Sequence, residues 1–149
     1  MFLWRISNHA SLDGRGGLLA GARWHLAGQP VVYLAESPSG SLLEVLVHLE
    51  LDLDNLPKTF KLSKIEVPST ISIRNFDEAK LTADWTNDPD STAEMGTAWL
   101  TSGSTALLCV PSAIVPETHN YLLNPRHDQA AKVKVLWNRD YPWDNRLLS

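Results

Sequence analysis

The stretch GGLLAGARWHLAGQPVVYLAESPSGSLLEVLVHLE, residues 16–50, has the pattern of a glycine-punctuated loop, then a strand, then a capped helix. The branched and aromatic residues of VVYLA, residues 31–35, are typical of a strand. Ser37 is an N-cap candidate and Pro38 suits the first helical position, so we expect a helix that runs through Leu49. Its buried stripe is predicted by apolar residues at helical spacing, namely Leu42, Val45, Leu46 and Leu49.

On both sides of this stretch the sequence predicts further strands and few helices. The expected strands are mostly rich in branched or aromatic residues and comprise Phe2–Ile6, Val31–Ala35, Lys61–Val67, Ala106–Val110 and Val133–Trp137. A second helix is expected over Thr92–Leu100, and Asp77–Ser91 has the composition of a loop. Strands interrupted by a few helices, without regular alternation, predict an α+β class. No stretch marks a domain boundary, so we expect a single domain over residues 1–149.

One face of the expected helix carries polar residues at helical spacing, namely Ser37, Ser41, Glu44 and His48. Two interpretations of this polar stripe stay open. A solvated face is the ordinary one, because charged residues are mostly exposed. The other is the wall of a cleft, because the leucines and valines around Glu44 leave this helix apolar on almost every side.

Further candidate site residues lie before and after this helix. Arg23, beside Trp24, is either a guanidinium packed on an aromatic ring or a fork for a diphosphate or ribose. Tyr33 is either a core residue of its strand or a platform for a ligand. Ser112 follows a proline and Asn124 precedes one, positions where a local cap and a turn are the ordinary roles. Taken singly, none of these residues defines a site.

Charge and motif content exclude several classes of function. The 13 basic and 17 acidic residues give a net charge of −4, and the basic ones are scattered, so we expect no direct nucleic-acid binding. The GGLLAG segment matches neither the glycine fingerprint of dinucleotide-binding folds nor a P-loop. The five histidines lack the spacing of metal ligands, so no metal is expected.

The single cysteine and the hydropathy of the chain bear on its compartment. Cys109 has no partner for an internal disulfide, and its apolar neighbours predict a buried thiol. No segment is long and apolar enough to span a bilayer, and MFLWRIS lacks the features of a leader peptide. We therefore expect no membrane association and a cytoplasmic location.

In order along the chain, several segments resemble the RES-domain family. They are the run from Arg23 through Tyr33 to Glu44, VPSAI at 110–114 and NYLLNPRH at 120–127, together with LWRIS at 3–7 and the segment 96–100. The resemblance covers essentially the whole chain. It departs at AGARWH, where Ala22 and His25 replace a glycine and an asparagine that the family usually has.

The family takes its name from arginine, glutamate and serine positions, which Arg23, Glu44 and Ser112 match, while Tyr33 matches its aromatic position. The resemblance implies an ADP-ribosyltransferase-like fold with a mixed, mostly antiparallel β core and a few helices. It implies the catalytic residues Arg23, Tyr33 and Glu44. It also implies a binding set of Arg23, Tyr33, Ser37, Ser112 and Asn124.

In function, the resemblance implies the toxin of a toxin–antitoxin system that depletes NAD by breaking its nicotinamide–ribose bond. Water or inorganic phosphate would accept the ADP-ribosyl group, and NAD would be a substrate with no further cofactor. Glu44 would stabilise the oxocarbenium-like state, while Tyr33 stacks on nicotinamide and Arg23 holds phosphate or ribose oxygens. The implied partner is an Xre-like antitoxin that binds DNA, and the toxin would be a homodimer within a larger complex.

Two alternatives stay open. The same site would serve an ADP-ribosyltransferase that passes ADP-ribose to a macromolecule. In a non-enzymatic module that binds a nucleotide or a partner protein, Glu44 would be dispensable.

Overall fold

The computed structural model describes residues 1–48 and 58–148, and their strands form one sheet in the order β4-β5-β6-β2-β1-β3-β7. Every neighbouring pair is antiparallel except β4 with β5, which is parallel. The predicted α+β class with a mixed, mostly antiparallel sheet is therefore confirmed. The strands are β1 (Phe2–Ser7), β2 (Val32–Ala35), β3 (Lys61–Glu66), β4 (Ile73–Asn75), β5 (Leu107–Pro111), β6 (His119–Leu123) and β7 (Lys134–Asp140).

Five of these strands fall where the sequence predicts them, with shifts at their ends, but β4 and β6 were not expected. The three residues of β4 are all exposed, so the strand has no buried face to give a signal. In β6, HNYLL, burial rises along the strand instead of alternating. A strand at the centre of the sheet, between β5 and β2, thus lacks the period-two pattern on which prediction depends.

Three α-helices are described: α1 (Arg15–Leu19), α2 (Pro38–His48) and α3 (Pro89–Ser102). The predicted cap of α2 is confirmed, because Ser37 Oγ accepts the Gly40 N–H at 3.0 Å. Leu49, expected at the end of this helix, lies outside the described residues. Helix α1 lies where the glycine-punctuated sequence predicts a loop. Short 3₁₀ helices complete the structure and comprise η2 (Glu78–Lys80), η3 (Trp85–Asn87), η4 (Ala130–Lys132) and η5 (Asn145–Leu148).

The expectation of a loop up to Ser91 is wrong, because α3 begins at Pro89. The Asp88 side chain accepts the Ser91 N–H at 3.3 Å, and proline occupies the first helical position. Both are helix-start signals that the predicted start at Thr92 overlooked.

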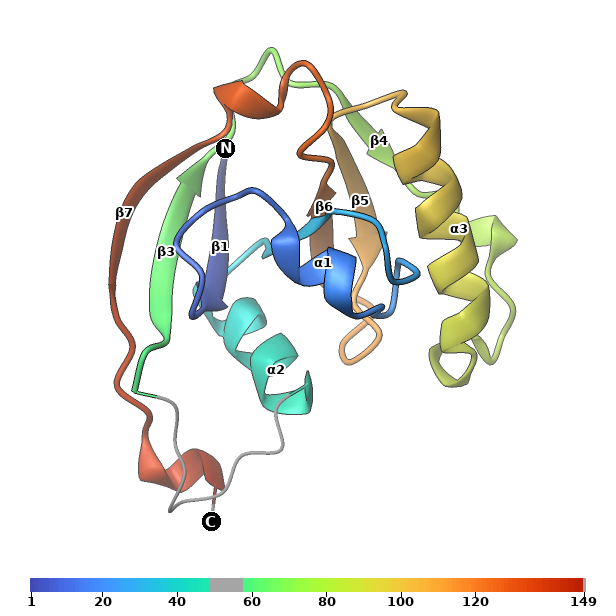
Figure 1. Ribbon diagram of the computed structural model, residues 1–149. Coiled ribbons are helices and arrows are strands. Elements are labelled where there is room, and N and C mark those ends of the chain that lie inside the picture. The colour runs from blue at the N-terminus through green and yellow to red at the C-terminus, as the bar shows by residue number, and fades with distance from the viewer. Residues whose placement is uncertain (49–57, 149) are drawn as a thin grey trace.

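The core has three parts that fix the helices on the sheet. One lies within the sheet, another joins α3 to β5 through Trp99 and Leu108, and the third joins α2 to β1 and β3 through Leu42 and Val45. Figure 1 shows α1 and α2 between two groups of strands. The strands β1, β3 and β7 lie on one side of these helices, and β5 and β6 lie on the other. Among the described helices, none is long and apolar enough to cross a membrane.

Candidate active site

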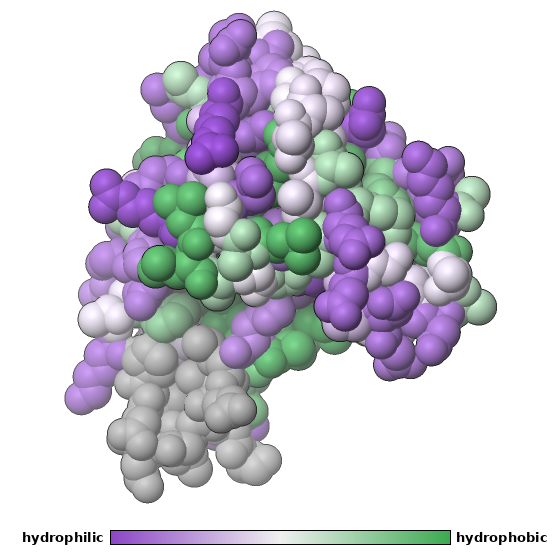
Figure 2. Space-filling model, turned by 45° about the vertical axis from the view of Figure 1, so that its right-hand side comes forward, coloured by the Kyte–Doolittle hydropathy of each residue, from purple (hydrophilic) through white to green (hydrophobic). Residues whose placement is uncertain are grey.

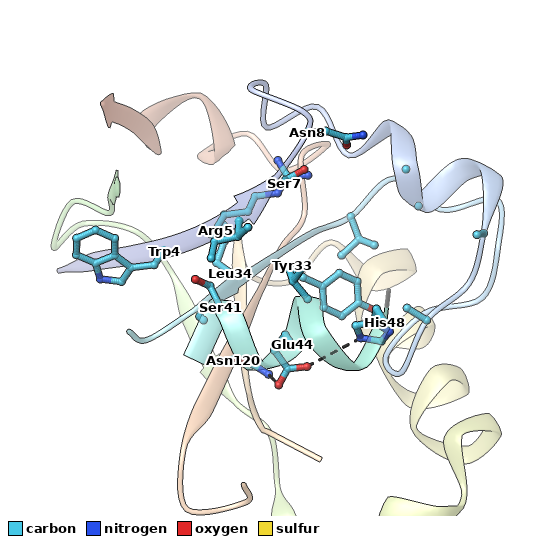
Figure 3. Close-up of a pocket in the computed structure, with 18 of the residues that line it drawn as sticks. Trp4, Arg5, Ser7, Asn8, Tyr33, Leu34, Ser41, Glu44, His48 and Asn120 are labelled. Carbon is cyan, nitrogen blue, oxygen red and sulfur yellow. Dashed lines mark hydrogen bonds and ion pairs between the residues drawn. The ribbon is translucent and has the colours of Figure 1, made fainter. Parts of the chain in front are cut away.

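Glu44 is the centre of the candidate site, because side chains from two other parts of the chain converge on its carboxylate. Ser112 Oγ donates to Glu44 Oε1 at 2.9 Å, and Asn120 Nδ2 donates to the same oxygen at 2.7 Å. Ser112 directly follows β5 and Asn120 lies in β6, the antiparallel neighbour of β5. The sheet therefore presents both donors to α2, as Figure 3 shows for Asn120.

The second carboxylate oxygen of Glu44, Oε2, does not accept either of these two hydrogen bonds. Its Oε2 lies 4.0 Å from Nε2 of His48, one helical turn further along α2. Among the described residues, no side chain donates a hydrogen bond to Oε2 at shorter range. Glu44 is 29% exposed at its side chain, so the carboxylate is accessible yet partly desolvated. One oxygen is fixed, and the other is available to a ligand.

Ser112 is itself held in place by the backbone. The backbone N–H groups of Ile114 and Val115 donate to Ser112 Oγ at 3.1 and 3.3 Å, and Ser112 is buried. Because its oxygen already accepts these bonds, its own proton is directed at the carboxylate. The hydroxyl thus orients Glu44.

Glu44 opens onto a cavity of about 380 Å³, a size in the range of small-molecule sites, which runs from roughly 300 to 1,000 Å³. We call it the Glu44 pocket. It is lined by parts of β1, β2, β6, α2 and the segment around α1, and the lining includes Trp4, Arg5, Tyr33, His48 and Asn120 (Figure 3). This combination of apolar walls and a few convergent polar groups is typical of a ligand site.

Arg5 is a pocket residue that sequence reasoning did not single out. Its Nη1 donates to the carbonyl oxygen of Ser11 at 2.9 Å, and burial lowers the pKa of its guanidinium. Asn120 was also passed over, because Asn124 was preferred within NYLLNPRH. Arg5 is a polar residue inside a predicted strand, whereas Asn120 lies in β6, which the sequence does not predict. Neither position indicates a site until the neighbouring strands are known.

The segment 20–26, which we call the arginine loop, is fixed against α3. Trp24 is buried between Phe76 and Trp85, with ring centroids 5.1 and 6.1 Å from its own. Thr92 Oγ1 donates to the carbonyl oxygen of Arg23 at 2.6 Å, and Thr97 Oγ1 accepts the Leu26 N–H at 2.9 Å. The loop is thus bonded to α3 at Arg23 and at Leu26.

Arg23 itself lies next to the Glu44 pocket. It lines a second hollow of about 390 Å³, which shares Gly21, Ala22, His25 and His48 with the first. We call this the Arg23 hollow. Arg23 Nη1 reaches the Trp85 carbonyl oxygen only at 3.5 Å, so its guanidinium retains donors for a ligand. The two hollows adjoin, with Glu44 in one and Arg23 in the other.

Tyr33 lines the Glu44 pocket with its ring, while its hydroxyl is engaged elsewhere. The oxygen accepts the Trp24 N–H at 3.1 Å and lies 2.7 Å from Nδ1 of His25. Burial raises the pKa of Tyr33 well above its ordinary value. The phenol therefore stays protonated and bonded to the arginine loop.

The structure does not bring every predicted site residue to this cavity. Ser37 caps α2 and is not among the residues lining the Glu44 pocket. Asn124 is buried, donates to the Leu100 carbonyl oxygen at 3.3 Å and lines a separate hollow with Arg126. Within the described residues, no cluster of three or more His, Cys, Asp or Glu side chains could hold a metal ion.

An α+β fold with a carboxylate fixed at a cavity of small-molecule size is typical of ligand-binding proteins and enzymes, and comparison with known proteins identifies the family. The model of the RES domain matches residues 2–144. The chain therefore belongs to the RES-domain family.

Curated relatives of similar length are toxins. A protein of Pseudomonas putida called Toxin Res is 49% identical over 150 residues, which cover 99% of each chain. The Prs ADP-ribosylating toxin of a Sphingobium species is 36% identical over 155 residues, which cover 97% of this chain and 95% of the relative. Toxin Res of Photorhabdus laumondii is also 36% identical, over 99% of this chain and 97% of its own.

The fold is also shared with a solved structure. A chain in the crystal structure of the M. tuberculosis MbcT–MbcA toxin–antitoxin complex matches with a TM-score of 0.73, covering 94% of this chain and 83% of that one. Its sequence identity is 17%, so this likeness supports the fold alone.

Proposed function

We propose that this chain is the toxin of a toxin–antitoxin pair and that it destroys NAD by cleaving the bond between nicotinamide and ribose. The observation that carries the proposal is the Glu44 carboxylate, held through Oε1 by Ser112 and Asn120 while Oε2 faces the pocket side of α2 near His48. Membership of the RES-domain family and the toxins among its relatives support the biological role.

The chemistry asks for a fixed negative charge near the ribose. Breaking the C–N bond develops positive charge on the ribose ring, and a preorganised carboxylate stabilises it without reorganisation. Nicotinamide leaves as a neutral molecule from a cationic ring, so the protein supplies no proton to it. A partly desolvated Glu44 with one immobilised oxygen meets this requirement.

The two adjoining hollows suit an elongated dinucleotide. Glu44 and the ring of Tyr33 would receive the nicotinamide riboside end, and Arg23 would bind the diphosphate, whose oxygens match a guanidinium fork. His48 lines both hollows and would lie beside the ribose between them.

The acceptor is a small nucleophile, either water or inorganic phosphate. Its oxygen forms a bond to the anomeric carbon as the bond to the nicotinamide nitrogen breaks, with the electron pair of that bond leaving on nicotinamide. Water gives ADP-ribose and a proton. Phosphate gives an ADP-ribose that carries phosphate at the anomeric position.

A second candidate is transfer of ADP-ribose to a macromolecule, because a relative that is 36% identical is named the Prs ADP-ribosylating toxin. The same pocket and the same role of Glu44 would serve this reaction. The acceptor would then be a side chain of another protein.

The proposed partner is an Xre-like antitoxin, which would carry the contacts to DNA, while the toxin would pair with itself in the larger complex. Apolar side chains exposed near the site support binding to a protein, since they include Leu19 in α1, Leu26 in the arginine loop and Val47 in α2. Figure 2 shows apolar groups gathered near the middle of the face that it presents.

The test is to incubate the purified chain with NAD, with and without inorganic phosphate, and to separate the products by chromatography. We expect free nicotinamide together with ADP-ribose or its anomeric phosphate. Label from NAD that appears on protein, with no free ADP-ribose product, would favour the second candidate. Intact NAD under all conditions would refute the proposal.

A further inference from the structure

His25, a residue at which the chain departs from the family pattern, makes two hydrogen bonds in a buried position. Its Nδ1 lies 2.7 Å from the Tyr33 hydroxyl oxygen, and its Nε2 lies 2.9 Å from the carbonyl oxygen of Ala20. The residue is 3% exposed. Its ring is tilted against that of Tyr33, with centroids 5.6 Å apart.

The hydrogen-bond partners determine where the ring proton of His25 and the hydroxyl proton of Tyr33 lie. A carbonyl oxygen only accepts, so the proton of His25 sits on Nε2 and is donated to Ala20. Burial lowers the pKa of His25, which favours the neutral ring with a free lone pair on Nδ1. The Tyr33 hydroxyl accepts the Trp24 N–H, so its own proton goes to that lone pair. Donors and acceptors therefore match in all three hydrogen bonds, from Trp24 through Tyr33 and His25 to Ala20.

This chain of hydrogen bonds ties the arginine loop to β2. Ala20, Trp24 and His25 belong to the loop, and Tyr33 belongs to β2, next to β1 in the sheet. On its other side the loop is bonded to α3 through Thr92 and Thr97. His25 stands in the wall that the Glu44 pocket and the Arg23 hollow share.

We propose that His25 is a positioning residue, which uses the Tyr33 hydroxyl to hold Arg23 at a fixed place relative to Glu44. The inference rests on the proposed function for its kinetic consequence, but the linkage itself is a property of the folded chain. It also assigns the Tyr33 hydroxyl to this linkage, so that only the ring of Tyr33 faces a substrate.

Two conservative substitutions separate the two bonds of His25. The side-chain amide of asparagine places a polar atom where Nδ1 stands, whereas that of glutamine reaches to the place of Nε2. His25→Asn should keep the bond to Tyr33 and so keep the KM for NAD within about threefold of wild type. His25→Gln and Tyr33→Phe should each raise KM by about tenfold or more, with kcat changed by less than about threefold.

The double variant His25→Gln/Tyr33→Phe completes the kinetic test. Both single changes break the same link, so the double variant should have the KM of the more impaired single variant. A merely structural histidine would lower the melting temperature and leave the KM of the folded fraction unchanged. Equal KM for the Asn and Gln variants, or effects that multiply in the double variant, would overturn the proposal.

Amide hydrogen exchange tests the linkage without reference to NAD. The Trp24 N–H donates to the Tyr33 oxygen, so its exchange should be faster in Tyr33→Phe by about tenfold or more. Tyr141→Phe, in which the altered ring packs on Trp143, is the matched control and should leave Trp24 exchange unchanged. An unchanged exchange rate of the Trp24 N–H in Tyr33→Phe would show that the proposed linkage is wrong. Intact NAD with wild-type protein refutes the proposed function alone.

Discussion

Asn120 donates from its side-chain amide to Oε1 of Glu44 at 2.7 Å, so that β6 and α2 meet at the carboxylate. An amide at this place supplies a donor without adding charge. An aspartate of the same shape would put a second carboxylate against the first, and like charges at this range raise the pKa of one member of the pair.

Replacement of Asn120 tests this arrangement. Asn120→Ala leaves Ser112 as a donor and should lower kcat/KM by about tenfold. Asn120→Asp should be less active at pH 7 than the alanine variant. Because a raised pKa in the folded state costs stability as the pH rises above the unfolded value near 4, its melting temperature should fall further below wild type between about pH 4 and pH 7. A difference in melting temperature between Asn120→Asp and wild type that stays constant with pH would contradict the argument from charge.

Removal of the charge of Glu44 tests its assigned role. Glu44→Gln keeps the size of the side chain and the bond from Asn120 through its carbonyl oxygen, yet the NAD cleavage rate should fall by about 10²-fold or more. The matched control is Glu94→Gln on the exposed side of α3, which should keep the wild-type rate. Circular dichroism and melting curves verify that both variants fold. A folded Glu44→Gln with the native rate would remove Glu44 from the mechanism.

The local part of this site was predictable from the sequence, and the convergent part was not. The Ser37 cap and the helical spacing predicted α2, and with it the polar stripe that contains Glu44. The donors to Glu44 lie 68 and 76 residues further along the chain, and one of them is in β6, which lacks a strand pattern. Which strand lies beside which is a tertiary property, so Asn120 could not be chosen over Asn124.

The same limit applies to the arginine loop. The pattern around Arg23 and Trp24 predicted residues of interest but not what holds them. Helix α3 approaches the loop at Gly96, where a β-carbon would overlap the carbonyl oxygen of Trp24. A glycine within a helix carries no sign of this contact in a single sequence.

Gly96 supplies a stability prediction. Because an added methyl group would push α3 away from Trp24, Gly96→Ala should destabilise the fold by about 1–3 kcal/mol in urea denaturation. Gly16→Ala is the control, since nothing lies within 4 Å of the added carbon and glycine is a poor helix former, and its stability should be unchanged or slightly higher. Equal stability of the two variants would contradict the close packing of α3 on the loop.

The buried state of His25 gives a pH prediction for stability. Burial lowers the pKa of His25 in the folded chain, so the unfolded chain takes up a proton first as the pH falls. The contribution of His25 is complete above the unfolded pKa of about 6.5 and is lost below it. The melting temperature of wild type should therefore fall more between about pH 7 and pH 5 than that of His25→Asn. His9→Asn, at an exposed histidine, should follow wild type, and parallel curves for all three proteins would contradict the assignment.

Arg23 is the last residue for which the geometry predicts a separable effect. It lies in the hollow next to the one that holds Glu44, so it should contribute to binding of NAD and little to the chemical step. Lysine keeps the charge but not the two parallel N–H donors that match a diphosphate. Arg23→Lys should raise the KM for NAD by about tenfold while kcat stays within about threefold.

Inorganic pyrophosphate, used as a probe of the same site, should compete with NAD in wild type and less strongly in the variant. The control is Arg15→Lys, at a side chain that is 84% exposed and paired with Asp13, and it should match wild type in both measurements. If pyrophosphate inhibits wild type and Arg23→Lys equally, with the same KM for NAD, the diphosphate is bound elsewhere and Arg23 serves only to pack the loop on Trp85.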